Sequence, residues 1–243
     1  MGDERYANDG QYTVQGVVTA FRVVEAVHNL DGAGTTELAD QLDLSKGAVH
    51  KHLKTLEQLG YLVRRDDAYH VGLRFLNLGL DARRRSDLYS VARSSVETLA
   101  GNAGERAFLV VAEAEEAVVL YSVDEGSYDA GGTEGKRLPL QTSVPGRAIL
   151  AHRPDLQSDD ITSEQKSALR QIRDQGYALG TEPSLGVSSR CIAAPIVDLE
   201  DRAVAALCVI GTSGSLSGKR FEEDVTGLVF SEAKTIEAHL LSA

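Results

Sequence analysis

The 243-residue sequence predicts an α+β fold with a helical N-terminal domain ending in a hairpin, a linker helix, and a C-terminal antiparallel sheet with helices. Three observations lead to this prediction. Apolar residues recur at helical spacing near the start of the chain, whereas short runs rich in Val, Leu and aromatic residues follow later. The length suits two modest domains. We expect an N-terminal domain at residues 1–73, a linker helix at 74–100 and a C-terminal domain at 101–243.

The N-terminal domain begins with two predicted helices. Val17, Phe21 and Val24 mark the expected inner face of a helix at about residues 14–30, which ends at the Gly-rich turn 31–34. A second helix is expected at residues 36–42, with Leu38 and Leu42 facing inward. A polar break of three residues separates it from the next helix.

The third helix, from Ser45 to about Leu59, carries the most informative pattern. Val49, Leu53 and Leu56 form one buried stripe, and the Ser45 hydroxyl is placed to cap the first turn. A short hairpin containing tyrosine and arginine follows. The predicted order is therefore helix, turn, helix and wing, an architecture whose second helix enters the major groove of DNA.

Positive charge is concentrated on this segment. Residues 44–65 contain five Lys or Arg and one acid, although the whole chain has a net charge of −11. A basic island in an acidic protein is typical of a nucleic-acid contact, whereas the alternative is an ordinary solvated helix face. We expect base-edge contacts near Lys46, Gly47, His50 and Lys51, and phosphate contacts from Lys54, Arg64 and Arg65, with Thr35 and Ser45 completing the DNA-binding set.

The linker is predicted to be a helix with a break. Phe75, Leu78 and Ala82 form one apolar stripe, the arginines at 83–85 interrupt it, and a second stripe continues from Leu88 to Leu99. We expect at least part of this surface to pack against a second subunit. The alternative is that the stripe packs on its own C-terminal domain.

The C-terminal domain is expected to contain four strands, at residues 106–112, 117–124, 189–198 and 203–212, with helices on one side of the sheet. Helices are predicted at 144–152, at 163–175 and from Phe221 to Leu240. If residues 199–202 close an antiparallel hairpin, residue i lies opposite residue 401 − i. Because side chains alternate along a strand, one face would then carry Ser189, Cys191, Cys208 and Ile210.

The sequence resembles the IclR family of transcriptional regulators. Residues 35–53, 60–62 and 69–72 are similar to the winged helix-turn-helix of that family, and residues 138–148, 176–177 and 190–198 to its effector-binding domain. The resemblance implies a GAF-like fold for the second domain, and a DNA-binding regulator of metabolic genes that responds to a small molecule. It also implies double-stranded operator DNA as a partner and a homodimer or a dimer of dimers.

The same resemblance places an effector pocket on the face selected by the hairpin register. Val144 and Pro145 match further pocket positions of the family, and another such position lies near Gly180 or Thr181. This sequence lacks the hydroxyls that family members binding small acids have at Cys208 and Ile210, and its nearest carboxylate is Glu182. The effector would be an organic acid, a sugar-derived metabolite or something more apolar. The alternatives are a lost ligand, or residues that are only core beneath the sheet.

Other functions are less favoured by the sequence. The two cysteines are expected to be diagonal neighbours beyond disulfide reach and to be reduced, so a thiol-based enzyme using Cys191 is a weaker alternative. We expect no catalytic residue, no metal site and no cofactor. An architectural DNA-binding protein without a ligand is a further alternative.

Compartment and solvent can also be predicted. The start of the chain lacks the features of a signal peptide, and the longest apolar run, at 203–210, is too short to span a bilayer. We therefore expect a cytoplasmic protein with no membrane partner. The excess of 36 acids over 25 bases, which are mostly arginine, favours a halophilic, haloarchaeal source over an ordinary acidic protein.

Overall fold

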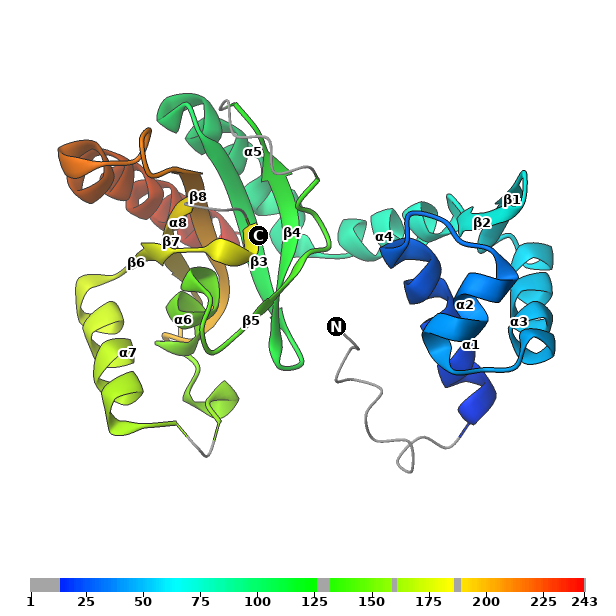
Figure 1. Cartoon of the computed structure of the whole chain (residues 1–243). Helices are drawn as coiled ribbons and strands as arrows, with labels where there is room; N and C mark the ends of the chain where they lie inside the picture. Colours follow the sequence, from blue (N-terminus) through cyan, green and yellow to red (C-terminus); the bar gives the residue numbers. More distant parts are fainter. Residues whose placement is uncertain (1–13, 126–131, 159–160, 186–188, 243) are drawn as a thin grey trace. The chain divides into compact units, whose positions relative to one another are not determined.

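The computed structural model describes residues 14–125, 132–158, 161–185 and 189–242. The chain divides into two compact units, one up to Ala82 and one from Arg83 onward (Figure 1). The first unit has one hydrophobic core, and the second has two.

The first unit is a three-helix domain with a two-stranded hairpin. It contains α1 (Gln15–Asn29), α2 (Thr35–Leu42), α3 (Lys46–Gln58), β1 (Leu62–Arg65) and β2 (Ala68–Val71). Leu38, Val49 and Leu53 are fully buried at its centre. Two backbone hydrogen bonds between Ala33 and Tyr69, of 2.9 and 3.1 Å, attach the hairpin to the turn between α1 and α2. The predicted helix, turn, helix and wing are therefore all present.

The inner face predicted for α1 is partly wrong. Val17 and Phe21 are 54% and 52% exposed, whereas Val23, Val24, Ala26 and Val27 are buried. The core of the unit contacts only the second half of this helix, so the apolar spacing of the first half does not correspond to burial within the unit.

The linker helix is interrupted at residues 85–86, close to the arginines at 83–85 where the break was predicted. α4 (Arg74–Arg84) ends and α5 (Asp87–Ala103) begins after Ser86, whose Oγ accepts a hydrogen bond from the Tyr89 amide at 3.4 Å. No residue of α4 is buried, although Phe75 packs against Tyr61 with ring centroids 5.0 Å apart. The stripe on α5 instead packs on the sheet of its own unit through buried Ala92, Val96 and Leu99. For α5 the alternative of intramolecular packing is therefore correct.

The second unit is built on a six-stranded antiparallel sheet in the order β5-β4-β3-β8-β7-β6. The four expected strands are β3 (Arg106–Glu113), β4 (Glu116–Val123), β7 (Ser189–Val197) and β8 (Ala203–Thr212). The edge strands β5 (Arg137–Pro139) and β6 (Ala178–Thr181) were not predicted. The helices are α6 (Val144–Leu150), α7 (Ser163–Gln175) and α8 (Thr226–Leu240), the last continuing a π-helical stretch at Arg220–Val225.

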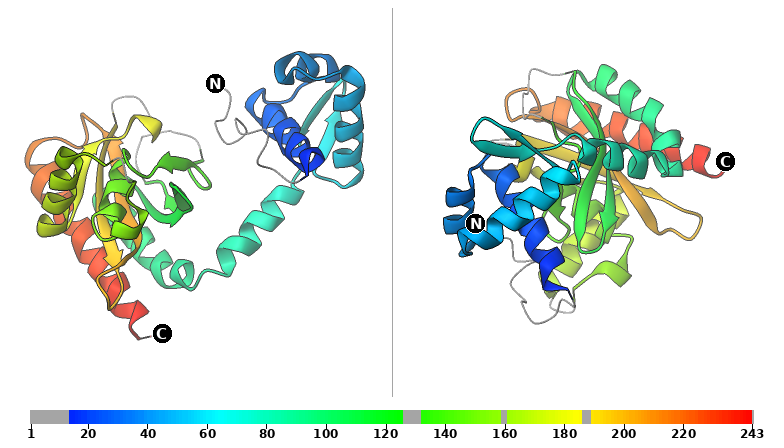
Figure 2. Two further views of the ribbon diagram at one scale, coloured as in Figure 1. Left: turned by 90° about the horizontal axis from the view of Figure 1, so that it is seen from below. Right: turned by 90° about the vertical axis from the view of Figure 1, so that its right-hand side faces the viewer.

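Helices cover both faces of this sheet, so the expectation of helices on one side is wrong. α5 and α8 lie side by side on one face, as the right-hand view of Figure 2 shows. α6 packs on the other face, against β6, β7 and β8, and α7 packs on α6. The alternating side chains of each central strand consequently contribute to two separate cores.

The predicted hairpin register is confirmed from Ser189 opposite Thr212 to Ile196 opposite Ala205. It shifts at Val197, which lies opposite Ala203. In the turn, the Asp198 carboxylate accepts hydrogen bonds from the Glu200 and Arg202 amides, both at 2.9 Å. Pro195 lies beyond the residues that pair with β6, so its missing amide hydrogen breaks no bond to that strand.

Candidate DNA-binding face and effector-domain wall

α3 presents a polar, basic face to solvent. Val49 and Leu53 are buried against the core, while the opposite side exposes Lys46, Gly47, His50, Lys51 and Lys54. Ser45 caps the helix as predicted, with its Oγ accepting the Ala48 amide hydrogen at 3.2 Å. The five exposed residues recur at helical spacing, so one rigid surface carries all of them.

The cations of this unit differ in their local partners. Lys54 pairs with Glu57 at 3.1 Å, and Arg64 lies 3.7 Å from Asp67. Within the described residues, no carboxylate lies within 4.0 Å of the charged groups of Lys46, Lys51 or Arg65. Exposed ion pairs contribute little free energy, so DNA phosphates can replace the partners of Lys54 and Arg64 at small cost.

The wing has an acidic tip that the predicted phosphate contacts did not take into account. Asp66 and Asp67 form the turn between Arg65 and Ala68, and Asp66 has a positive φ of 53°. Thr35 lies elsewhere in the unit, partly buried at the first position of α2.

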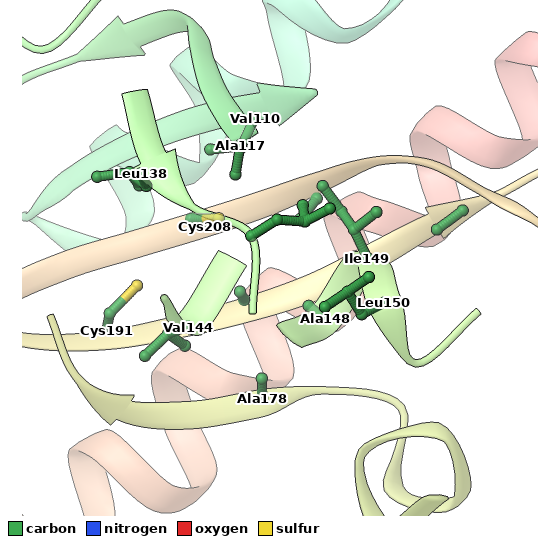
Figure 3. Packing of buried hydrophobic residues seen from close by; sticks show 14 of the residues in the cluster. Val110, Ala117, Leu138, Val144, Ala148, Ile149, Leu150, Ala178, Cys191 and Cys208 are labelled. Atoms are coloured by element: carbon green, nitrogen blue, oxygen red, sulfur yellow. The ribbon is translucent and has the colours of Figure 1, made fainter. Parts of the chain in front are cut away.

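In the second unit, the residues predicted to line an effector pocket mostly share one wall. Val144, Cys191, Cys208 and Ile210 are fully buried in the same core, and Pro145 and Ser189 are also buried. Figure 3 shows Val144 on α6, Cys191 on β7 and Cys208 on β8 in this core. We call the side chains of Val144, Pro145, Ser189, Cys191, Cys208 and Ile210 the α6–β7–β8 wall.

Thr181 does not belong to this wall, so of the two positions left open by the resemblance only Gly180 lies on its face. Thr181 lies opposite Arg190, one position away from the pair of Gly180 and Cys191, and its side chain is exposed. The alternation of β6 therefore turns Thr181 to the other face of the sheet.

Glu182, the next residue, faces the wall instead and is only 2% exposed. Its Oε2 accepts a hydrogen bond from the Val144 amide at 2.8 Å. Its own amide donates to the Ser189 carbonyl at 3.2 Å, and the Ser189 hydroxyl donates to the Glu182 carbonyl. The sequence identified Glu182 as the nearest carboxylate, but four-residue β6 was too short to predict its direction.

The wall is a poor environment for thiolate chemistry. Burial raises the pKa of the Cys208 thiol well above its usual value, and the neighbouring Cys191 thiol and Glu182 carboxylate act in the same direction. Both cysteines are free and buried. The raised pKa disfavours a thiolate at Cys208, and burial limits the access of any reactant to Cys191, the residue of the redox alternative.

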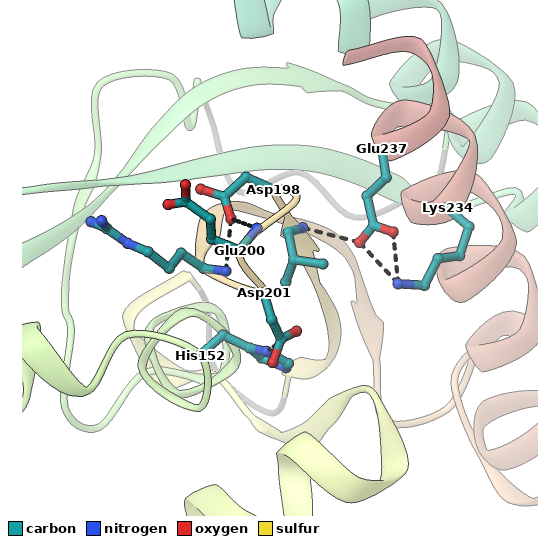
Figure 4. Close-up of polar contacts among 8 residues, drawn as sticks. His152, Asp198, Glu200, Asp201, Lys234 and Glu237 are labelled. Carbon is teal, nitrogen blue, oxygen red and sulfur yellow. Dashed lines mark hydrogen bonds and ion pairs between the residues drawn. The ribbon is translucent and has the colours of Figure 1, made fainter. Parts of the chain in front are cut away.

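At the end of the β7–β8 hairpin away from Cys191, several polar side chains contact its turn (Figure 4). His152, after α6, lies with Nδ1 3.0 Å from an Asp201 carboxylate oxygen. At the end of β7, the Val197 amide donates to the Glu237 carboxylate of α8 at 3.0 Å, and Lys234 pairs with the same carboxylate. The structure thus ties α6 and α8 to the hairpin that carries the wall.

The described residues include no cluster of three His, Cys, Asp or Glu side chains that could hold a metal ion. None of their helices is long and apolar enough to cross a membrane.

Family models match both units of the chain. Residues 16–66 match the IclR helix-turn-helix domain, and residues 81–238 match the C-terminal domain of the bacterial transcriptional regulator IclR. The chain belongs to the IclR family. It is a DNA-binding transcriptional regulator with a helix-turn-helix domain and a C-terminal effector-binding domain.

Individual IclR relatives match over almost the whole length. A probable HTH-type transcriptional regulator, ArcR of Halobacterium salinarum, is 31% identical, covering 99% of this chain and all of the relative. A putative regulator from Rhodococcus sp. RHA1 has a TM-score of 0.77 at 24% identity, covering 94% of this chain and 99% of the other. An IclR homologue from Microbacterium hydrocarbonoxydans, complexed with 4-hydroxybenzoate, has a TM-score of 0.75 at 21% identity, covering 94% and 100%. The structural likenesses establish the fold.

Gly47 provides a test of close DNA approach by this IclR chain. A Cβ atom added at Gly47 would meet no atom within 4 Å, so alanine fits the free protein. We expect Gly47→Ala to stabilise the N-terminal unit by about 0.5 kcal/mol, because glycine is a poor helix former. If the α3 backbone approaches the base edges here, the same methyl group lowers operator affinity about tenfold.

Thermal denaturation and fluorescence anisotropy on one preparation measure both effects of Gly47→Ala. A more stable variant with unchanged operator affinity would show that the α3 backbone does not approach DNA at this position.

Proposed function

We propose that this regulator binds operator DNA through α3, which inserts its exposed face into the major groove. Lys46, His50 and Lys51 contact base edges there, with Gly47 allowing close approach, while Lys54, Arg64 and Arg65 contact phosphates. The observation that carries this proposal is the exposed basic face of α3 on a chain whose net charge is −11. Ser45 and Thr35 lie at the starts of α3 and α2, and we assign them supporting phosphate contacts.

We further propose that the active form is a homodimer, or a dimer of such dimers. The N-terminal unit exposes Val17 and Phe21 on α1, and Leu73, Leu76 and Leu78 at α4, with Leu73 80% exposed. Exposed apolar groups of this size favour a protein partner. A second copy of the chain is the occupant that also supplies the second recognition helix, since two half-sites are read by two such helices.

The C-terminal unit is proposed to sense a small molecule at the α6–β7–β8 wall and so to control metabolic genes. The Microbacterium homologue is complexed with 4-hydroxybenzoate, which supports a small organic molecule as the ligand here. Because binding to the native state stabilises it by RT ln(1 + [L]/Kd), a thermal-shift screen of metabolites tests the role directly. We propose no catalytic activity, and we place the protein in the cytoplasm with the DNA that it binds.

A ligand-independent DNA-binding protein is the second candidate. The complete burial of Val144, Cys191 and Cys208 favours it, because a ligand can reach them only after the wall opens. An architectural protein would cover DNA without discrete sites. Chromatin immunoprecipitation with sequencing separates the two, since a regulator gives sharp peaks at promoters and an architectural protein gives broad coverage.

We also propose that the protein works at high salt. Its excess of acids and the relative from Halobacterium salinarum support this. In molar salt the Debye length falls to about 3 Å and counterion release contributes less affinity, so short-range base and shape contacts carry more of the binding. Operator affinities are therefore best compared in molar KCl.

A further inference from the structure

A cavity of about 300 Å³ lies between α6 and α7 of the second unit. Its lining combines the aliphatic side chains of Ile161, Ala168 and Leu169 with the cationic side chain of Arg147. The volume is at the lower end of the range for small-molecule sites, which is about 300–1,000 Å³. No residue of the α6–β7–β8 wall lines this space, so we name it separately as the α6–α7 cavity.

Arg147 extends from α6 over the edge strand β6. Its Nη2 donates a hydrogen bond to the Leu179 carbonyl at 3.4 Å. A Cβ atom added at Gly180 would lie 3.0 Å from the same nitrogen, so this glycine leaves the space that the guanidinium occupies. The position of the guanidinium is therefore set by α6 and β6, and not by a charged partner.

Most donors of the Arg147 guanidinium lack an acceptor. Of its five N–H groups, one bonds to a residue in the described part of the chain, and that bond is long. The buried Nε has no partner, and no carboxylate of the described residues lies within 4.0 Å of the charged group. A partly buried guanidinium without acceptor or counter-charge costs free energy, and an anion in the cavity would remove that cost.

Two further polar side chains of the lining affect the choice of ligand. Glu164 is exposed on the first turn of α7, so solvent screens its repulsion of an anion and the effect is small. The Gln141 side-chain amide already donates to the Leu156 carbonyl at 3.4 Å. Arg147 is the one cation among the lining residues, and it supplies the charged donor.

We propose that the α6–α7 cavity binds a small carboxylate with an aliphatic body. The guanidinium of Arg147 matches the two oxygens of a carboxylate, while Ile161, Ala168 and Leu169 cover the aliphatic body. A phosphate would bring a second negative charge near Glu164 and leave the aliphatic surface uncovered. This ligand site is additional to the wall, and its occupation does not depend on the proposed function.

Trifluorobutyrate is the probe for this site, with fluorine NMR of the probe as the readout. The full-length protein is titrated in KCl, with the potassium salt of the probe replacing KCl at constant total potassium. We expect saturable binding by the wild type. Trifluorobutanol, which has the same body without the charge, should bind about tenfold more weakly or less well still, because it loses a charge-assisted hydrogen bond. Inorganic phosphate should not displace the probe.

Four variants locate the bound probe. Arg147→Met keeps the aliphatic part of the side chain and should weaken binding about tenfold or more. Ala168→Leu fills the cavity from α7 with a good helix former and should abolish saturable binding. Glu164→Gln should strengthen binding about twofold, because it removes a weak repulsion. Arg170→Met removes an exposed arginine of α7 that does not line the cavity, and it should bind the probe as the wild type does.

Three results would overturn the proposal: no saturable binding by the wild type, equal affinity for trifluorobutyrate and trifluorobutanol, or binding that Ala168→Leu leaves unchanged. The last result would place the probe outside the cavity. If circular dichroism shows that Arg147→Met is unfolded, Ala168→Leu decides the question. Operator binding by the wild type, measured in parallel without the probe, reports on the proposed function, and its absence would leave the NMR comparison readable.

Discussion

The variant Lys51→Ala binds operator DNA about ten- to a hundredfold more weakly than the wild type, because a good base contact is worth about 1–3 kcal/mol. Lys51 lies on the exposed face of α3, and within the described residues no carboxylate approaches its ammonium group. Its removal leaves the core untouched, since Val49 and Leu53 face the opposite side.

Arg65→Ala is the matched control, since it removes a wing cation that is expected to contact only phosphate. Fluorescence anisotropy with operator and scrambled duplexes should show an equal loss on both for Arg65→Ala, with the salt slope reduced by about one unit. Lys51→Ala should lose affinity mainly on the operator. Equal operator affinity of Lys51→Ala and the wild type would refute the docking of α3.

Gly146→Ala is expected to destabilise the C-terminal unit by about 3 kcal/mol or more, through overpacking in a rigid core. A Cβ atom at this position would lie 2.2 Å from the Leu140 carbonyl oxygen, and a backbone group cannot rotate away as a side chain can. The α6 helix must therefore separate from the segment after β5, which disrupts the wall that α6 helps to form.

Gly227→Ala is the corresponding control on α8, where an added Cβ meets nothing within 4 Å. It should stabilise the helix by about 0.5–1 kcal/mol. Thermal or denaturant unfolding of the two variants gives the comparison. Similar unfolding midpoints would mean that the packing of α6 against Leu140 is looser than the structure indicates.

Most of the fold could be predicted because its main helices and strands are long enough for their sequence patterns to show. The two strands of the β7–β8 hairpin are nine and ten residues, so their register could be derived from one four-residue turn. The derivation failed only at Val197, where the pairing shifts. Ser45 and Ser86 each begin a helix by capping it, and hydroxyl caps are visible in sequence.

Shorter or longer-range features could not be predicted in this way. β5 and β6, of three and four residues, carry too few positions to show alternation. Helical spacing marks Val17 and Phe21 as one face of α1, but spacing does not reveal whether the partner of that face is the same chain. Coverage of both sheet faces by helices depends on tertiary packing.

The candidate sites were likewise predictable where they depend on local pattern, and not where they depend on tertiary packing. The exposed face of α3 follows from helical period and charge alone, so those predicted residues lie together in the structure. The wall also depends on the direction of the side chains of β6, which was not predicted as a strand, so the sequence could not decide between Gly180 and Thr181. The sequence named Glu182 as the nearest carboxylate, but its burial and its hydrogen bond with the Val144 amide depend on packing that the sequence does not reveal.

The insertion of α3 into the major groove is tested most directly by methylation protection with dimethyl sulfate in molar KCl. This reagent modifies guanine N7 in the major groove and adenine N3 in the minor groove. If α3 enters the major groove, the wild type protects guanine N7 in two half-sites and Lys51→Ala loses part of this protection. Protection confined to adenine N3, or no protection at a site bound with measurable affinity, would contradict the insertion of α3.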